Sequence, residues 1–177
     1  FPRGGRGYMA ARIGAPERDI WIAPVDSPMT LRPFVATPAD EAEPSVSPDG
    51  KWLAYVSNES GRSEVYVRPM PGPGARVPIS TDGGSEPVWS PKAVELFYRG
   101  SGKIILARVS DMDRVATVTR QPLFDDIYIS APVRAMYDVS PDGSKLLFTK
   151  LAGGDSKTFV VLNWFTEVKQ RIAAASR

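Results

Sequence analysis

Two identical tetrapeptides are the strongest candidates for chemistry in this sequence. Ser-Pro-Asp-Gly occurs at 47–50 and again at 140–143. Each copy offers a hydroxyl that could act as a nucleophile and a carboxylate that could bind a cation. The same four residues are also typical of a tight turn, because Pro presets φ, Asp caps nearby amides and Gly accepts positive φ. We favour the turn, since its repetition along the chain is more typical of structure than of a catalytic site.

The chain lacks the residue types that normally activate a nucleophilic serine. The 177-residue chain contains no His and no Cys, so it cannot build a Ser-His-Asp or Cys-His nucleophile. Zinc sites normally need the same two residue types. The chain also lacks a Gly-x-Ser-x-Gly nucleophile elbow. We therefore predict no catalytic residue, no metal ligand and no cofactor in this chain.

Other short motifs have a functional and a structural interpretation. The run RGGRG at 3–7 resembles RNA-binding segments, but a net charge of +2 gives no electrostatic case for nucleic acid. RGSGKI at 99–104 lacks the spacing of a phosphate-binding loop and is predicted to be a Gly-rich hairpin turn. The acidic residues at 111–113 and 125–126 lack the spacing of a calcium-binding loop. We predict that both acidic segments are solvated loops.

The elements that carry these motifs form an internal repeat. The Ser-Pro pairs lie at 47, 90 and 140, and a second apolar motif follows each of them. The three repeat copies and the motifs that follow them are EPSVSPDGKWLAYVS (43–57), EPVWSPKAVELFYRG (86–100), MYDVSPDGSKLLFTK (136–150), EVYVRPM (64–70), KIILARV (103–109) and TFVVLNW (158–164). The middle copy has Lys92-Ala93 in place of Asp-Gly, which predicts a hairpin with a strained or altered turn.

Repeat spacings of 43 and 50 residues match four short strands per unit, as in a propeller blade. The predicted fold class is all-β: a partial β-propeller of about three and a half four-stranded antiparallel blades, with a short C-terminal helix. The expected blades are 7–37, 41–80, 84–124 and 133–164, and the helix covers 164–174. The first unit lacks an inner strand and the last has three strands, so we expect a fragment of a longer protein with two open edges.

The pattern Ser-Pro-Asp-Gly, then an apolar strand, then a Gly-containing turn before VYVRP resembles the TolB-type, WD-repeat-like propeller repeats. The C-terminal stretch SKTFVVLNWFTEVKQRI (156–172) is similar to the end of bacterial Ser/Thr kinase-type receptors that carry such a propeller. That resemblance implies a cytoplasmic kinase, a membrane helix and an extracytoplasmic propeller that acts as a sensor or interaction module. Prolyl oligopeptidase and dipeptidyl-peptidase-type enzymes, and free periplasmic TolB-like binding proteins, are the alternatives.

Propellers usually bind on their two faces or in the central channel. Glu43 and Glu86 precede the expected inner strands at equivalent places, and Arg134 lies just before the third. We list these three as possible channel or face positions, while a solvated charge or a salt bridge between blades is the favoured interpretation of the glutamates. The expected partners are a protein or small ligand on a propeller face and the rest of the propeller upstream, with no nucleic acid and no membrane contact by this segment.

Overall fold

The structure, a computed structural model, describes residues 8–14, 18–92, 94–110, 117–130, 135–152 and 155–161. These residues form four antiparallel sheets, in which hydrogen-bonded neighbours follow chain order. The sheets are β1 (Tyr8–Ile13), β2 (Asp19–Pro24), β3 (Arg32–Val35); β4 (Glu41–Val46), β5 (Trp52–Ser57), β6 (Glu64–Pro69), β7 (Val77–Pro78); β8 (Ser85–Trp89), β9 (Glu95–Gly100), β10 (Lys103–Ser110), β11 (Thr117–Asp125); and β12 (Tyr137–Val139), β13 (Leu146–Ala152), β14 (Asp155–Val161). The predicted all-β partial propeller is confirmed, and we call the sheets blades 1 to 4.

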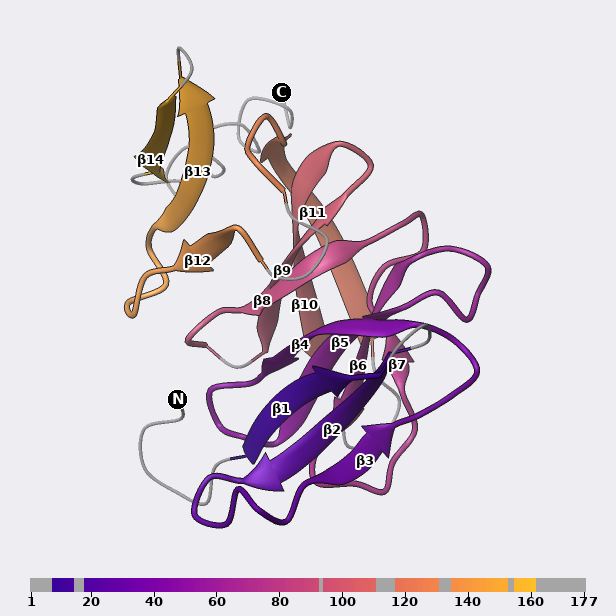
Figure 1. Cartoon of the computed structure of the whole chain (residues 1–177). Coiled ribbons are helices and arrows are strands. Elements are labelled where there is room, and N and C mark those ends of the chain that lie inside the picture. The colour runs from indigo at the N-terminus through magenta and orange to yellow at the C-terminus, as the bar shows by residue number, and fades with distance from the viewer. Residues whose placement is uncertain are drawn as a thin grey trace.

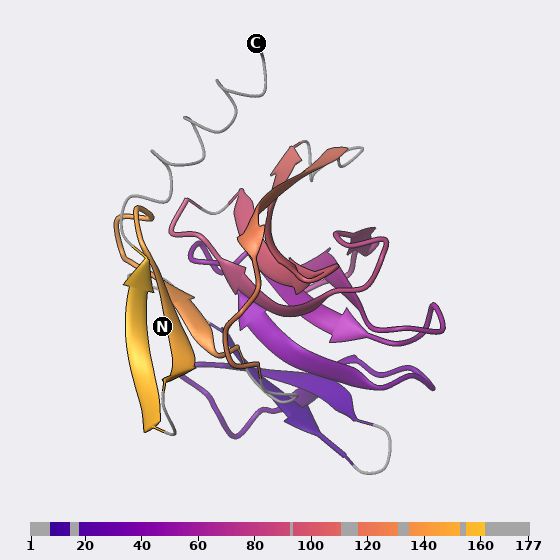
Figure 2. The ribbon, with the colours of Figure 1, turned by 90° about the horizontal axis from the view of Figure 1, so that it is seen from above.

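The blades follow one another in space in the order of the chain. Figure 1 shows the colour passing from the indigo sheet β1–β3 through the magenta sheets to the orange and yellow sheet β12–β14. Seen from above, the sheets fan out as separate layers (Figure 2). Within the described residues, blades 1 and 4 have three strands each and blades 2 and 3 have four.

Both faces of the central blades are buried, which explains their continuous apolar runs. All six residues of β5 are buried. Side chains alternate across a strand, so Leu53 and Tyr55 pack toward blade 1 and Trp52, Ala54 and Val56 toward blade 3. The hydrophobic core is therefore divided into layers between neighbouring blades.

Three such layers hold the arc together. The layer between blades 2 and 3 is centred on Trp52, Trp89 and Tyr98. The layer between blades 3 and 4 contains Phe97 and Phe148, and Phe148 stacks on Tyr137 with ring centroids 5.2 Å apart. Trp52, Tyr66, Trp89 and Tyr98, which recur at strand positions of the repeat, all pack in these layers. Trp164 and the expected helix 164–174 lie outside the described residues.

The Ser-Pro-Asp-Gly segments are turns between the first and second strand of their blades. The Ser47 hydroxyl donates to Asp49 Oδ1 (2.6 Å) and accepts from the Trp52 amide (3.0 Å). Ser140 repeats both contacts with Asp142 (2.6 Å) and the Lys145 amide (2.9 Å). In blade 2 the fourth residue, Gly50, has φ +71°. Both side-chain oxygens are thus engaged in closing the hairpin.

The altered middle copy keeps its hairpin. Trp89 still pairs with Leu96 across β8 and β9, and the Ser90 amide donates to the Glu95 carbonyl (2.9 Å). In the middle copy the Ser90 hydroxyl lies 3.3 Å from the Lys92 amide. In the other two copies the equivalent hydroxyl donates instead to an oxygen of the Asp side chain. Position 93 itself lies outside the described residues.

The inner strands β4 and β8 contain a Glu-Pro pair and still join their sheets. Their register with the second strand shifts at this pair, which marks a bulge. The outer strand of blade 2, β7, is only two residues long.

Candidate functional site

Antiparallel pairing places the loops of each blade on two opposite faces. One face carries the inner turns 47–51, 90–94 and 140–145, and we call it the turn face. The other carries the segments that link one blade to the next, 36–40, 79–84 and 126–130, together with the hairpin loops 58–63 and 101–102. We call this second surface the connector face.

The two predicted glutamates lie inside the inner strands, where they connect neighbouring blades. The Glu43 carboxylate oxygen Oε2 accepts a hydrogen bond from the Glu86 backbone amide at 2.5 Å. Glu86 Oε2 in turn accepts from the Met136 amide at 2.7 Å. The three residues are equivalent positions of the repeat. Glu43 and Glu86 both have positive φ, 53° and 50°, so the two positions share an unusual backbone conformation as well as the contact to the next blade.

Glu86 is also one partner of a buried ion pair. Its side chain is 1% exposed, and Oε2 lies 3.0 Å from Nε of Arg99, which is 5% exposed. Since Arg99 belongs to the next strand of the same blade, the expected salt bridge between blades is instead an ion pair within blade 3. The contact that crosses to blade 4 is the hydrogen bond to Met136. Arg134, the third predicted position, lies outside the described residues.

Arg99 is the centre of the polar cluster between blades 3 and 4. Its NH1 lies 2.5 Å from both carboxylate oxygens of Asp126, and its NH2 donates to the Ile129 carbonyl at 2.7 Å. The guanidinium lies 5.5 Å from the Tyr137 ring centroid, and the Tyr137 hydroxyl donates to the Glu86 carbonyl at 2.7 Å. Burial, and then the charge of Glu86, raise the pKa of Tyr137, which keeps this donor protonated.

The interpretation of residues 125–126 as a solvated loop is therefore wrong for Asp126. Its carboxylate fixes the connector to the buried Arg99. Asp125 is more exposed and pairs with Lys103 at 2.5 Å. The Gly-rich segment 99–104 is a hairpin turn, as predicted, while its first residue, Arg99, has the structural role described above. Segments 3–7 and 111–113 lie outside the described residues.

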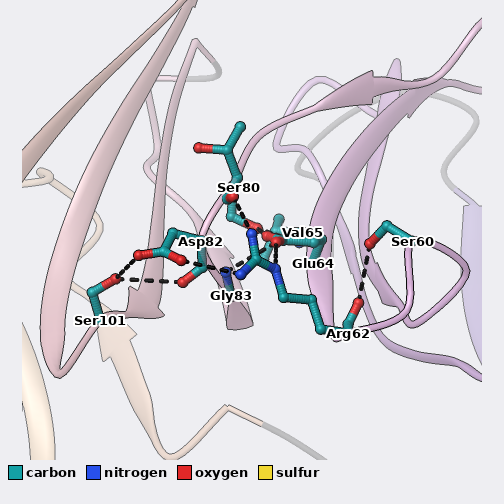
Figure 3. A network of polar contacts seen from close by, with 9 residues as sticks. Ser60, Arg62, Glu64, Val65, Ser80, Asp82, Gly83 and Ser101 are labelled. Carbon is teal, nitrogen blue, oxygen red and sulfur yellow. Dashed lines mark hydrogen bonds and ion pairs between the residues drawn. The ribbon is translucent and has the colours of Figure 1, made fainter.

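A second polar cluster fixes the connector between blades 2 and 3 (Figure 3). Arg62, in the hairpin loop of blade 2, donates to Glu64 Oε1 (2.7 Å), Asp82 Oδ1 (3.1 Å) and the Thr81 carbonyl (2.5 Å). Glu64 also accepts from the Gly83 amide at 3.0 Å and from the Ser80 hydroxyl. The connector is thus held at several successive residues by one blade.

The hydrogen bonds of Glu64 control its ionisation. Its burial alone would raise the pKa of this carboxyl group, but the donors Ser80, Gly83 and Arg62 together outweigh burial and lower the pKa. Glu64 is therefore a stable carboxylate at neutral pH. Its role is structural, because its two carboxylate oxygens already accept hydrogen bonds from Ser80 and Gly83 of the connector and from Arg62.

Two cavities open on the connector face, on either side of the blade 2 hairpin loop. The larger, about 490 Å³, is lined by Ser60, Gly61, Arg62, Glu64, Tyr66, Ser80 and Thr81. The smaller, about 380 Å³, is lined by Thr37, Pro38, Ala39, Asn58 and Glu59. Both are wide open to solvent, unlike the enclosed and mostly apolar pockets that bind drug-sized ligands. Their walls mix hydroxyl, amide and charged groups, which suits polar ligands or the side chains of a protein partner.

Sequence reasoning missed the residues that shape this face. Arg62, Glu64 and Arg99 match no functional motif, and their roles depend on partners about 20 to 30 positions away. The only available signal was their place beside the hairpin turns of a repeat. Within the described residues, no three acidic, His or Cys side chains are grouped closely enough to hold a metal ion. No helix in that same part of the chain is long and apolar enough to cross a membrane.

Comparison with known proteins identifies the fold but not a family. No family model matches the sequence, and no curated protein matches it. Among solved structures, TolB from Acinetobacter baumannii superposes on 89% of the chain with a TM-score of 0.51 and 17% identity. The nidogen/laminin complex covers 89% with a TM-score of 0.60 and 15% identity. A structure from a study of two prolyl endopeptidases covers 92% with a TM-score of 0.51 and 13% identity.

The fold is therefore that of the TolB-type β-propellers and their structural relatives. At these identities the likeness concerns architecture and leaves function open. The chain spans 50% of the TolB chain, 58% of the nidogen/laminin match and 27% of the prolyl endopeptidase chain.

Proposed function

We propose that this chain is a non-catalytic β-propeller module that binds a protein or small ligand on its connector face. The observation that carries the proposal is the distribution of polar groups. The repeated Ser and Asp side chains of the turn face close their own hairpins, and the inner-strand glutamates bond to neighbouring blades. Among the described residues, the connector face holds two open cavities with polar walls.

We further propose that the module is the C-terminal, extracytoplasmic part of a bacterial Ser/Thr kinase-like protein. The resemblance of its C-terminal sequence to the end of such receptors supports this context. In this arrangement a membrane helix upstream tethers the propeller, and the rest of the propeller precedes this chain. Ligand binding on the connector face would then be sensed outside the membrane.

Site-specific photocrosslinking in the full-length protein tests the binding face. A photoreactive residue is placed at Asn58 or Thr81 on the connector face, and at Lys51 or Lys145 on the turn face as matched exposed controls. We expect discrete adducts from the first pair and none from the second. Adducts from the turn face alone would overturn the assignment of the face.

The kinase context has a separate test. The complete gene should encode a kinase catalytic loop and a membrane-spanning helix upstream, and deletion of the propeller should change autophosphorylation. A gene that encodes neither feature would rule the context out without affecting the binding-face proposal.

A peptidase propeller is the second candidate, favoured by the superposition on a prolyl endopeptidase structure. It predicts a Gly-x-Ser-x-Gly elbow and a catalytic His elsewhere in the gene, because this chain contains no His. Peptide hydrolysis by the full-length protein, lost when that elbow serine is replaced, would establish it.

A further inference from the structure

A buried carboxyl group lies at the base of the first connector. Glu41, the first residue of β4, is 0% exposed. Its Oε1 accepts a hydrogen bond from the Thr37 hydroxyl at 2.5 Å, while Oε2 has no hydrogen-bond partner among the described residues. An unpaired buried charge is costly, so this environment favours the neutral acid.

The charged groups around Glu41 add to this preference. Burial is the main cause that raises the pKa of Glu41. The hydrogen bonds from Thr37 lower the pKa in part, and the charges of Asp19 on β2 and Glu59 in the hairpin loop raise it, so that the net shift is upward. Neighbouring cations are engaged elsewhere: Arg18 pairs with Asp40, and Arg76 with Glu59. Tyr55 on β5 also interacts with these charges, and burial raises its pKa to about 12, so it remains neutral.

Glu64 provides an internal comparison. Glu41 and Glu64 pair with Ser57 from opposite sides, at the same end of blade 2. Both are buried, yet Glu64 receives three hydrogen-bond donors on its carboxylate and its pKa is lowered. The absence of donors on Oε2 therefore distinguishes Glu41, rather than burial alone.

The Glu41 carboxyl group is connected directly to the wall of the smaller cavity. The Thr37 hydroxyl, which donates to Glu41, also accepts from the Ala39 amide at 3.1 Å. The next amide, of Asp40, donates to Asn58 Oδ1 at 2.9 Å. Thr37, Ala39 and Asn58 all line the cavity. Three hydrogen bonds, together with the peptide bond between Ala39 and Asp40, thus connect the carboxyl group to both walls.

We propose that Glu41 is a proton-operated latch: the neutral acid holds connector 36–40 closed against blade 2, and ionisation loosens the connector and reshapes the 380 Å³ cavity. The consequence for binding rests on the proposed function, but the latch itself does not. A carboxyl whose pKa is raised in the folded state stabilises that state below the ordinary value. This stabilisation is lost as the pH rises through the raised pKa.

Hydrogen exchange on the isolated full chain between pH 4 and 8 tests the latch without any ligand. After correction for intrinsic exchange, protection of amides 36–41 should fall with rising pH, by up to about tenfold per pH unit between the ordinary and the raised pKa. Glu41→Gln should keep the protection at every pH. Glu64→Gln is the matched control and should affect amides 80–84 but not the pH profile of 36–41.

A second pair of variants keeps Glu41 in place, in case Glu41→Gln fails to fold. Asp19→Asn and Glu59→Gln each remove a charge that raises the pKa of Glu41, so each should move the transition to lower pH. The latch is refuted if Glu41→Gln has the wild-type pH profile, or if the Glu41 carboxyl resonance titrates at or below the ordinary value. Loss of partner crosslinking with an intact latch transition would instead count against the proposed function.

Discussion

The Glu43 carboxylate lies 2.5 Å from the Glu86 backbone nitrogen, across the boundary between blades 2 and 3. Glu86 repeats the contact with Met136 of blade 4. A glutamate side chain of β4 and another of β8 thus each fix the equivalent residue of the next inner strand. The register between blades is set by this polar contact as well as by the apolar layers.

Replacement of Glu86 by Ala should destabilise the fold more than the same replacement of Glu43. It removes one partner of a buried ion pair with Arg99, so a loss of roughly 3 kcal/mol or more in the free energy of unfolding is expected. Glu43→Ala removes an acceptor from one amide and should cost about 1–2 kcal/mol. Urea denaturation of both variants measures the difference, and equal losses would contradict the role of Arg99.

Gly50 and Gly84 should respond to Ala for different reasons. Gly50 has φ +71° and open space around the position of an added Cβ, so Gly50→Ala should cost about 1 kcal/mol through backbone strain alone. At Gly84 the added Cβ would lie 2.5 Å from Ser80 Oγ. Gly84→Ala should therefore also disturb the Ser80–Glu64 contact and cost more. Thermal unfolding compares the two, and a larger loss at Gly50 would contradict the argument.

Ser47→Ala tests the structural assignment of the repeated turn. The Trp52 amide would lose its buried acceptor, with an expected cost of about 1–3 kcal/mol. Ser90→Ala is the matched control, because the Ser90 hydroxyl lies 3.3 Å from the Lys92 amide, which is longer than the 3.0 Å between Ser47 and the Trp52 amide. It should cost less in the same denaturation assay. A negligible effect of Ser47→Ala on stability would reopen the question of a functional serine.

Glu64→Gln should destabilise the chain at neutral pH but not in acid. The pKa of Glu64 is lowered in the folded state, so its carboxylate contributes stability above the ordinary pKa. That contribution is lost as the pH falls through the lowered value. We expect a deficit of about 1–3 kcal/mol at pH 7 relative to wild type, which shrinks toward pH 3. A deficit that is constant with pH would show that the charge is not the cause.

The repeat predicted the architecture because each blade buries both faces in the same way. The Ser-Pro-Asp-Gly turns and the strand order follow from local sequence. The polar clusters were not predictable in this way. Glu86 was recognised by its repeat position, but neither its partner Arg99 nor Asp126, which pairs with Arg99, has a repeat equivalent that would identify it. Glu41 was missed because the burial of one carboxyl oxygen, Oε2, without a donor is a property of the packed structure.

Met136 occupies the repeat position at which blades 2 and 3 carry a glutamate. The Met136 amide donates to the Glu86 carboxylate, but Met136 has no carboxylate that could accept a hydrogen bond from a following blade. In this series of inner-strand contacts each glutamate bonds to the next blade along the chain, and the series ends at blade 4. A neighbour placed beside blade 4 must be aligned by other means, so a duplicated copy of blade 4 would not extend the array as a copy of blade 3 would.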